Sequence, residues 1–423
     1  MYKSIYLPFD NSAHAACALE LGIAIAQRSA ARITGSHVYA ARLHDLRFRQ
    51  MESGLPQRYR GEAKLAEQRE VHDELITRGL GLVSDSYLAV VSSKCAAAGV
   101  PSRCVALEGR NWQRLVEDIR ASDHDLVVMG ALGLGAVDIS RLGSVCERVA
   151  RRTDRDLLVV KTRPLDRAGC IAVAIDGSAR SFGALMAALE LSRIFERPVE
   201  AVAVYDPHFH AVAFRSISGV LSPAAAEVLR FSEQQRLHEE IIDGGLARIY
   251  QAQLDAAAKL AAGRGAKLRT MLLAGKPFEQ LLDYVRERQP WLLALGRTGA
   301  HSDAEMDLGS ATENLLRSAD CHLLLAARGH EPALEQAADS ATAWTAEAEA
   351  RMQRVPESAR AMARRAVLMH AAQRGHTVVT CDVIDSCLNA LMRDGTTAPE
   401  HEAVAGDAAA RPSSCPFGKR QAR

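Results

Sequence analysis

The stretch "VMGALGLGAVDISRLGSV", residues 128–145, places Gly130, Gly133, Gly135 and Gly143 after an apolar run and then continues with Ser144. Glycine costs backbone entropy, so four glycines in one loop need a reason beyond chain connection. An apolar strand pattern precedes the loop and a helical pattern, "GSVCERVARRT", follows it. This order of strand, loop and helix is typical of α/β proteins. Taken alone, the loop is compatible with a phosphate site or with a flexible turn.

The same loop recurs 166 residues further along the chain. Gly296, Gly299, Gly309 and Ser310 in "LGRTGAHSDAEMDLGSA" stand 166 positions after Gly130, Gly133, Gly143 and Ser144. The same offset carries Asp10 onto Asp176 and the segment 67–75 onto 233–241. An offset shared by several separated features indicates internal duplication. The sequence therefore predicts two copies of one domain, residues 1–164 and 167–328.

Each copy alternates short apolar runs with helical patterns, which predicts a doubly wound parallel sheet with helices on both faces. Expected strands are 4–9, 32–40, 102–108, 125–130 and 156–161, then 170–175, 199–205, 267–273, 291–296 and 321–326. A long helix is expected before each third strand. Its apolar stripe in the first copy comprises Leu75, Ile76, Leu80, Val83, Tyr87 and Val91. The segments 41–60 and 207–226 are expected to be irregular surface loops.

A glycine-rich loop that opens a helix is suited to binding an anion. The first N–H groups of a helix are unpaired, and the positive end of its dipole favours phosphate. Ser144 and Ser310 could donate their hydroxyls to phosphate oxygens, or they could be ordinary helix caps. Asp10 and Asp176 stand at the carboxyl end of the first strand, where parallel sheets bind ligands. A carboxylate there could accept hydrogen bonds from ribose hydroxyls, or it could cap the next helix.

The pattern Gly-x2-Gly-x9-Gly-(Ser/Thr), present twice, resembles the nucleotide loop of the ATP-binding universal stress proteins. The resemblance implies two tandem five-stranded sheets of strand order 3-2-1-4-5, an adenine nucleotide α-hydrolase-like fold, and ATP, with or without Mg²⁺, as the ligand. It implies adenine contacts near the ends of the first two strands. The ligand-binding residues expected in the first copy are Pro8, Phe9, Asp10, Val38, Met129, Gly130, Gly133, Gly143, Ser144 and Val145. Those expected in the second copy are Ala174, Ile175, Asp176, Val204, Leu295, Gly296, Gly299, Gly309, Ser310 and Ala311.

The two loops differ in charge. Asp138 and Arg141 cancel between Gly133 and Gly143, whereas the second loop holds three acids, Asp303, Glu305 and Asp307. Each carboxylate near a phosphate costs roughly 1 kcal/mol at 4 Å in water. Without magnesium, the first site is therefore expected to bind ATP more tightly than the second.

Composition excludes several classes of partner. The formal net charge of +1 gives no reason to expect nucleic acid or a membrane surface. No signal-peptide pattern and no apolar run of about 18 residues occurs, so a cytoplasmic protein is expected. Nine cysteines without a CxxC pair predict reduced thiols. His72 and His238, each followed by two acidic residues, are better explained as parts of polar helix faces than as metal ligands, and no metal site is expected.

A third segment, residues 342–392, resembles the small helical domain that ends the B subunit of light-independent protochlorophyllide reductase. The matching features are Trp344, Ala348, Glu349, Pro356, Arg360, Arg364, Ala371 and Gly375. Nothing resembles the remainder of that enzyme, so reductase activity is not implied. Arg354, Arg360, Arg364 and Arg365 could form a basic face for a protein partner, or a solvated helix face. Residues 393–423 are expected to be disordered.

These features predict a nucleotide-responsive stress regulator whose two copies pack as an intramolecular pseudo-dimer, with a homodimer as the alternative. Its helical appendage would bind a protein partner. No pair of residues is arranged as a base and a water-positioning group, so no catalytic residue is assigned. An enzyme of the same fold with slow ATP hydrolysis remains an alternative. A structural protein that binds no nucleotide is another.

Overall fold

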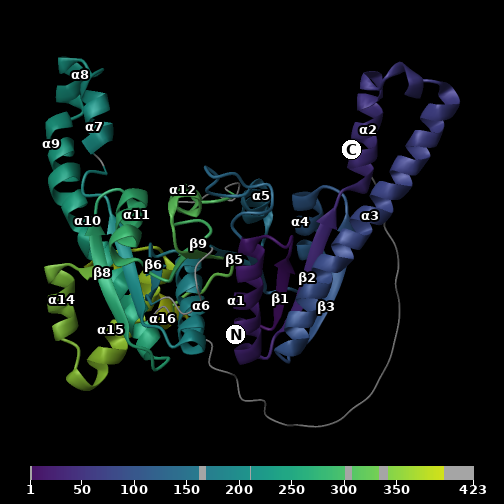
Figure 1. The fold of residues 1–423 in the computed structure, drawn as a ribbon. Coiled ribbons are helices and arrows are strands. Elements are labelled where there is room, and N and C mark those ends of the chain that lie inside the picture. The colour runs from purple at the N-terminus through teal and green to yellow at the C-terminus, as the bar shows by residue number, and fades with distance from the viewer. Residues whose placement is uncertain (1, 162–167, 210, 301–306, 333–341, 395–423) are drawn as a thin grey trace, which may run out of the picture. The chain divides into compact units, whose positions relative to one another are not determined.

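The structure is a computed structural model that describes residues 2–161, 168–209, 211–300, 307–332 and 342–394 (Figure 1). The chain forms two compact units, 1–342 and 343–423. The larger unit holds both copies of the repeat. The smaller unit holds the helical segment and is described by itself below.

The first repeat is a parallel five-stranded sheet in the order β3-β2-β1-β4-β5. Its strands are β1 (Ser4–Pro8), β2 (Arg32–Tyr39), β3 (Ser102–Glu108), β4 (Leu126–Gly130) and β5 (Asp156–Val160). Its main helices are α1 (Ala13–Ser29), α3 (Glu62–Ala97), α4 (Asn111–Ala121) and α5 (Ser144–Arg152). The predicted strand order is therefore confirmed in this half.

The second repeat has the same plan, in the order β8-β7-β6-β9-β10. Its strands are β6 (Ile171–Ala174), β7 (Val199–Tyr205), β8 (Leu268–Ala274), β9 (Leu292–Gly296) and β10 (His322–Ala326). Its main helices are α6 (Ala179–Phe195), α10 (Asp243–Ala262), α11 (Pro277–Arg288) and α12 (Ser310–Ser318). All ten predicted strands are present.

Two apolar layers cover the two faces of the sheet. One layer packs residues of α1, α3, α6 and α10 against one face, and the other packs α4, α5, α11 and α12 against the opposite face. The inner strands read as continuous apolar runs because both of their faces are covered. In β5 and β10 every residue is buried. The doubly wound architecture is thus confirmed.

The two predicted sheets are joined into one sheet of ten strands. Strands β5 and β10 pair antiparallel, with Leu158 opposite Leu324 at the centre of the pairing. An unpaired edge strand exposes a row of backbone donors and acceptors. Pairing the two edges satisfies these groups, which explains why the halves do not remain separate sheets.

Two side chains add hydrogen bonds across this junction, one from each repeat, at the ends of β5 and β10. Asp156, the first residue of β5, accepts the N–H of Ala327, which directly follows β10, at 2.9 Å. His322, the first residue of β10, accepts the N–H of Lys161, which directly follows β5, at 3.1 Å on Nδ1. Each repeat therefore supplies a side-chain acceptor, here called a cap, for the backbone N–H that follows the last strand of the other repeat.

Asp156 is the more heavily used of these two caps. Its carboxylate is 1% exposed, and it also accepts the Tyr2 hydroxyl at 2.8 Å and the Arg328 guanidinium at 2.7 and 2.9 Å. The guanidinium in turn lies 4.7 Å over the Tyr2 ring. The neighbouring Asp156 carboxylate holds the pKa of Arg328 above its usual range, in opposition to burial, which lowers it. This cluster joins the start of the chain, β5 and the segment after β10.

Four charged side chains connect α5 with α12 across the same junction. Arg151 pairs with Glu313, and Arg317 pairs with both Glu147 and Glu313 at 2.6 Å. Glu147 and Arg151 stand 166 positions before Glu313 and Arg317, so the two helices contribute equivalent residues. Hydrogen bonds to Arg317 and Arg151 hold the pKa of Glu313 below its usual range.

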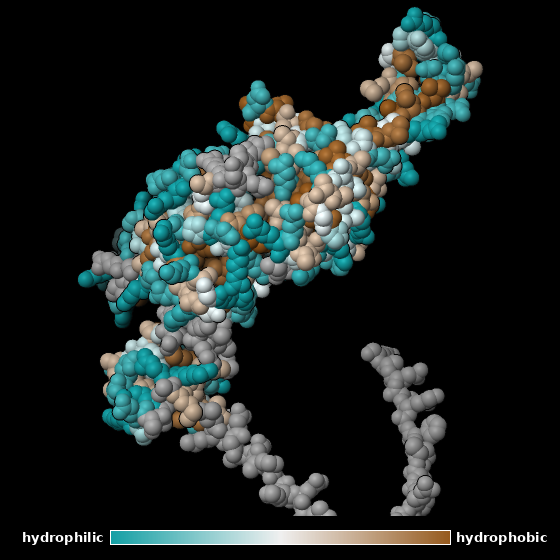
Figure 2. All heavy atoms as spheres, turned by 60° about the horizontal axis from the view of Figure 1, so that its bottom comes forward, coloured by the Kyte–Doolittle hydropathy of each residue, from teal (hydrophilic) through white to brown (hydrophobic). Residues whose placement is uncertain are grey.

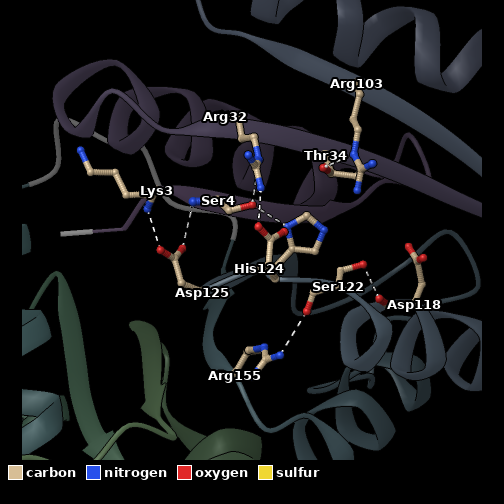
Figure 3. A network of polar contacts seen from close by, with 11 residues as sticks. Lys3, Ser4, Arg32, Thr34, Arg103, Asp118, Ser122, His124, Asp125 and Arg155 are labelled. Carbon is tan, nitrogen blue, oxygen red and sulfur yellow. Dashed lines mark hydrogen bonds and ion pairs between the residues drawn. The ribbon is translucent and has the colours of Figure 1, made fainter.

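A polar network ties the amino ends of the strands in the first repeat (Figure 3). Asp125 accepts the N–H groups of Lys3 and Ser4 at 2.7 and 3.1 Å, and Ser4 Oγ lies 2.9 Å from His124 Nδ1. Burial lowers the pKa of His124. These contacts fix β1 to the start of β4, at the end of the sheet opposite its carboxyl edge.

The expectation of irregular loops at 41–60 and 207–226 was wrong. Residues 41–51 form α2 (Ala41–Met51), followed by the short turns η1 (Glu52–Gly54) and η2 (Gln57–Tyr59). The second segment forms α7 (Ala211–Ser218) and α8 (Pro223–Val228), before α9 (Phe231–Arg236) and the π-helical η3 (Leu237–Ile242). The helices of each segment extend away from the sheet as an arm (Figure 1).

Contacts within each arm explain why these segments are helical without a regular apolar stripe. Phe48 of α2 stacks on His72 of α3 with ring centroids 4.1 Å apart, and in the second arm Phe214 lies 5.0 Å from His238. Both histidines are thus packed against phenylalanine rings. The predicted stripe on α3 is buried at Val91, but Leu75 remains 66% exposed. Apolar side chains remain visible along the projecting arm at the upper right of Figure 2.

In its described residues, 343–394, the smaller unit contains three helices and two short parallel strands. These are β11 (Ala343–Trp344), α14 (Ala346–Gln353), α15 (Glu357–Gln373), β12 (Val378–Val379) and α16 (Cys381–Asp394). Arg364 donates to both carboxylate oxygens of Glu349 at 2.8 and 2.9 Å and lies 4.4 Å over the Trp344 ring. Arg360 donates to the carbonyls of Val355 and Gln353. Two of the four arginines proposed as a basic face are therefore engaged inside the unit.

Replacing Asp156 by alanine is expected to lower the free energy of unfolding by about 2–4 kcal/mol, because it leaves the buried Tyr2 hydroxyl and the N–H of Ala327 without their acceptor. Chemical denaturation followed by circular dichroism measures the effect. Asp154→Ala is the control: its side chain is 58% exposed and pairs with Arg155, so it should cost about 1 kcal/mol or less. Equal losses in the two variants would show that the Asp156 cluster does not hold the repeats together.

Candidate functional site

A cavity of about 640 Å³ opens at the carboxyl ends of β1, β2 and β4. The chain runs from β1 outward to β2 and β3, and it returns on the other side of β1 through β4 and β5. This reversal makes the crevice between β1 and β4 the switch point at which open α/β sheets bind ligands. The cavity lies at that point.

The structure brings all ten predicted residues of the first copy to this cavity. They are Pro8, Phe9, Asp10, Val38, Met129, Gly130, Gly133, Gly143, Ser144 and Val145. The ten predicted residues of the second copy line a smaller cavity of about 260 Å³ at the ends of β6, β7 and β9. They are Ala174, Ile175, Asp176, Val204, Leu295, Gly296, Gly299, Gly309, Ser310 and Ala311. These positions establish proximity, and the roles toward a ligand stay predictions.

The amino end of α5 faces the first cavity with open donors. Gly143 is the N-cap and supplies no capping side chain, and Ser144 is already the first helical residue. The alternative in which Ser144 caps the helix is therefore wrong. The first intrahelical bond is donated by Glu147 to Gly143, so the N–H groups of residues 144–146 have no intrahelical partner. With the exposed Ser144 hydroxyl, they form an anion-binding set.

Two glycines in the first loop are required by close contacts. A Cβ at Gly130 would lie 2.7 Å from the backbone carbon of His14 in α1. A Cβ at Gly133 would lie 2.5 Å from Asp10 Oδ2. Gly135, in the same loop, has nothing within 4 Å of such a Cβ. The first two glycines therefore let the loop approach α1 and the Asp10 carboxylate, whereas Gly135 makes no such contact.

Asp10 anchors the loop to the end of β1. Its carboxylate accepts the N–H of Leu134 at 3.1 Å on Oδ2 and the N–H of Ser12 at 3.1 Å on Oδ1. The N-cap of α1 is Ser12, so Asp10 does not itself cap the helix. A carboxylate offers about four lone-pair sites, so the two backbone bonds leave capacity for ribose hydroxyls.

Asp176 repeats this arrangement in the second copy. It accepts the N–H of Ala300 at 3.0 Å and the N–H of Ser178 at 3.0 Å, and Ser178 is the N-cap of α6. A Cβ at Gly299 would lie 2.6 Å from Asp176 Oδ2. The pairing of an aspartate with the second glycine of the loop is therefore a property of both sites.

Several lining residues were missed by the sequence reasoning. His37 and Asn111 line the first cavity, and Tyr250 and Thr298 line the second. Asn111 begins α4 two residues after Gly109, whose φ is +139°. Gly109 and Gly275 also stand 166 positions apart, and this repetition was a signal for the third wall of each site. No pattern in the sequence distinguished His37 or Tyr250.

Buried basic groups stand close to the first loop. Burial lowers the pKa of Lys161, and burial together with the Lys161 charge lowers the pKa of His14. Burial raises the pKa of the Cys146 thiol to about 12, so this thiol is not a nucleophile at neutral pH. The residue equivalent to Lys161 in the second copy is Ala327, so the second repeat has no lysine at this position, next to its last strand.

Two arginines, Arg297 and Arg180, contact the second loop but are not among the described residues that line its cavity. Arg297, which directly follows Gly296, is 9% exposed and donates to the carbonyls of Asp307 and Arg151, both at 3.1 Å. Burial lowers the pKa of Arg297. Arg180 donates to Thr298. Asp303 and Glu305, on which the predicted charge difference depends, lie outside the described residues, and Asp307 is described and exposed.

Within the described ranges, no group of three or more His, Cys, Asp or Glu side chains could hold a metal ion. No helix there combines the length and the apolar character needed to cross a bilayer.

Comparison with known proteins places both repeats in one family. The model of the universal stress protein family matches residues 1–161 and 170–327. A family described as the proto-chlorophyllide reductase 57 kD subunit matches residues 344–387, within the smaller unit. The two resemblances inferred from the motifs are thereby confirmed.

Individual relatives align mostly with one repeat. A universal stress protein of Staphylococcus saprophyticus is 28% identical over 166 residues, 39% of this chain and 86% of the relative. One from Thermus aquaticus is 29% identical over 162 residues, 38% of this chain and 100% of the relative. The crystal structure of a universal stress protein from Archaeoglobus fulgidus covers 77% of this chain and 98% of that one, at 18% identity and a TM-score of 0.46.

Gly130→Ala is expected to destabilise the larger unit by about 1–3 kcal/mol, because the added methyl group overlaps the backbone of α1. Gly135→Ala adds the same group in open space and serves as the control. Thermal unfolding of the two variants measures the difference. A Gly130→Ala protein as stable as Gly135→Ala would mean that the loop does not pack against α1.

Proposed function

This chain belongs to the universal stress protein family, and from that premise we propose that it is an ATP-binding regulator that responds to adenine nucleotide. The observation that carries the proposal is the open amino end of α5, which faces a cavity within the usual size range of small-molecule sites, roughly 300–1,000 Å³. Asp10 stands on the wall of the same cavity. One cavity thus offers donors for phosphate and acceptors for a sugar.

Different residues would bind the phosphate, ribose and adenine parts of the nucleotide. The N–H groups after Gly143 and the Ser144 hydroxyl would hold phosphate oxygens, with Gly130 and Gly133 allowing the backbone to come close. Asp10 would accept hydrogen bonds from the ribose. Val38 and Phe9 supply apolar surface for adenine. A carboxylate repels phosphate, which supports placing Asp10 at the sugar end.

Magnesium fits this arrangement as a companion of the nucleotide. Mg²⁺ keeps several waters and is commonly held by substrate phosphates with one or two carboxylates. Asp10 is the one carboxylate that the described wall of the first cavity contributes, and it is assigned to the ribose, so waters and phosphate oxygens would make up the ion's coordination shell.

We further propose that the two repeats act as an intramolecular pseudo-dimer. Support comes from the antiparallel pairing of β5 with β10, from the reciprocal caps at Asp156 and His322, and from the equivalent charges on α5 and α12. Equivalent elements contacting one another in antiparallel fashion are what a two-fold axis produces. The smaller unit would supply the contact with a protein partner.

Regulation is favoured over catalysis by the chemistry of the first cavity. Asp10 is occupied by two backbone N–H groups, and His37 lies 3.0 Å from Ser84 Oγ on the far side of the wall. Burial lowers the pKa of His37 and so favours the neutral imidazole. Neither group is paired with a second one that would position water for attack on a phosphate.

Gly133→Ala is expected to raise the dissociation constant for Mg-ATP at the first site by roughly tenfold. The added methyl group displaces Asp10 from Leu134, and a hydrogen bond to a charged group contributes about 1.5–3 kcal/mol. Gly135→Ala should stay within about twofold of the unmodified chain. Isothermal titration calorimetry measures both. Equal affinities would exclude the Asp10 anchor as part of an ATP site.

ATP hydrolysis by the purified chain is expected to be slower than about 1 per second, the lower end of ordinary enzyme rates. Phosphate release, measured with and without Mg²⁺, gives the rate. A magnesium-dependent rate well above this value would contradict a regulator and favour an enzyme.

A further inference from the structure

The two cavities differ in the side chain that forms the wall near the aspartate. In the first cavity this side chain is His37, which stands on β2. Ser84 Oγ of α3 lies 3.0 Å from His37 Nδ1, and Tyr87 packs edge-on against the imidazole with ring centroids 5.1 Å apart. Ser84 is fully buried, so the imidazole, backed by Ser84 and Tyr87, is the group that meets a ligand.

In the second repeat the ring comes from the helix instead of the strand. Ala203 occupies the strand position equivalent to His37, and Tyr250 of α10 occupies the helix position equivalent to Ser84. Tyr250 lines the second cavity together with Asp176. The first copy thus has its large side chain on the strand and its small one on the helix, and the second copy has the reverse.

This exchange brings the phenol close to the carboxylate. Burial and the charge of Asp176 raise the pKa of Tyr250, so its hydroxyl is neutral at physiological pH. Gln253 lies one turn further along α10. Its Cδ would be 3.0 Å from a Cβ added at Gly177, the residue that follows Asp176. The middle of α10, which carries Tyr250 and Gln253, therefore lies against the turn that carries Asp176.

The described residues leave the second cavity smaller than the first. The first cavity, about 640 Å³, lies inside the range usual for small-molecule sites, and the second, about 260 Å³, lies below it. Both retain their glycines and their serine at the phosphate end. A sugar placed on Asp176 in the way proposed for Asp10 would meet the Tyr250 ring.

We propose that Tyr250 keeps the nucleoside half of ATP out of the second cavity, so that the chain binds one ATP, at the first site. This inference rests on the proposed ATP binding and adds which of the two sites performs it. Tyr250 is then a specificity-determining residue, and the second cavity keeps only the phosphate end of a nucleotide site.

The test is calorimetric titration of Mg-ATP into the full-length chain and into Tyr250→Ser, which installs the residue of the first repeat. Stoichiometry is expected to rise from one to two ATP per chain. The double variant Ala203→His, Tyr250→Ser places both residues of the first repeat, His and Ser, at the equivalent positions of the second. Its imidazole fills space that the single variant leaves empty. Ile249→Ser, at a neighbouring position that is 52% exposed, is the matched control and should keep a stoichiometry of one.

Two outcomes would overturn the inference while leaving the proposed function intact. One is a stoichiometry of two in the unmodified chain. The other is a stoichiometry of one in both Tyr250 variants when circular dichroism shows them folded. Absence of ATP binding in every form would instead refute the proposed function, so the two failures are distinguishable.

Discussion

The antiparallel pairing of β5 with β10 is the interaction on which the larger unit depends. Each half of the sheet would otherwise end in a strand that is now buried along its whole length, with its backbone donors and acceptors facing solvent. Joining the edges leaves β3 and β8 as the outer strands, and both contain exposed residues. The caps at Asp156 and His322 and the charged residues of α5 and α12 all lie along this junction. The same helices begin at the two glycine loops, so the junction also orients the loops.

The site follows from the topology and from one contact between a carboxylate and a glycine. The reversal between β1 and β4 creates the crevice, and Asp10 holds the loop across it by accepting the N–H of Leu134. Only glycine at position 133 lets the carboxylate come this close. The same contact between Asp176 and Gly299 shows that the loop spacing encodes a backbone geometry common to both repeats.

The duplication made much of this structure predictable from the sequence. The ten strands follow from apolar periodicity and a shared offset. Their order in each half and most residues around the two cavities came from the family resemblance that the glycine loops carry. The helices at 41–51 and 211–218 could not be predicted, because a ring contact such as Phe48 on His72 stabilises them in place of a regular apolar stripe. The exchange of His37 for Tyr250 between strand and helix was also hidden, because it is a difference between copies that only packing reveals.

The caps at the junction are chemically unlike: Asp156 on one side, His322 on the other. In a dimer of two identical chains, one codon specifies both sides of such a contact, so the two caps would have to be the same residue. Here each cap has its own codon. Asp156 could therefore acquire the salt bridge to Arg328 while His322 packed against Trp291. Duplication within one gene therefore lets the two equivalent cap positions, which would be identical in a symmetric dimer, mutate and be selected separately.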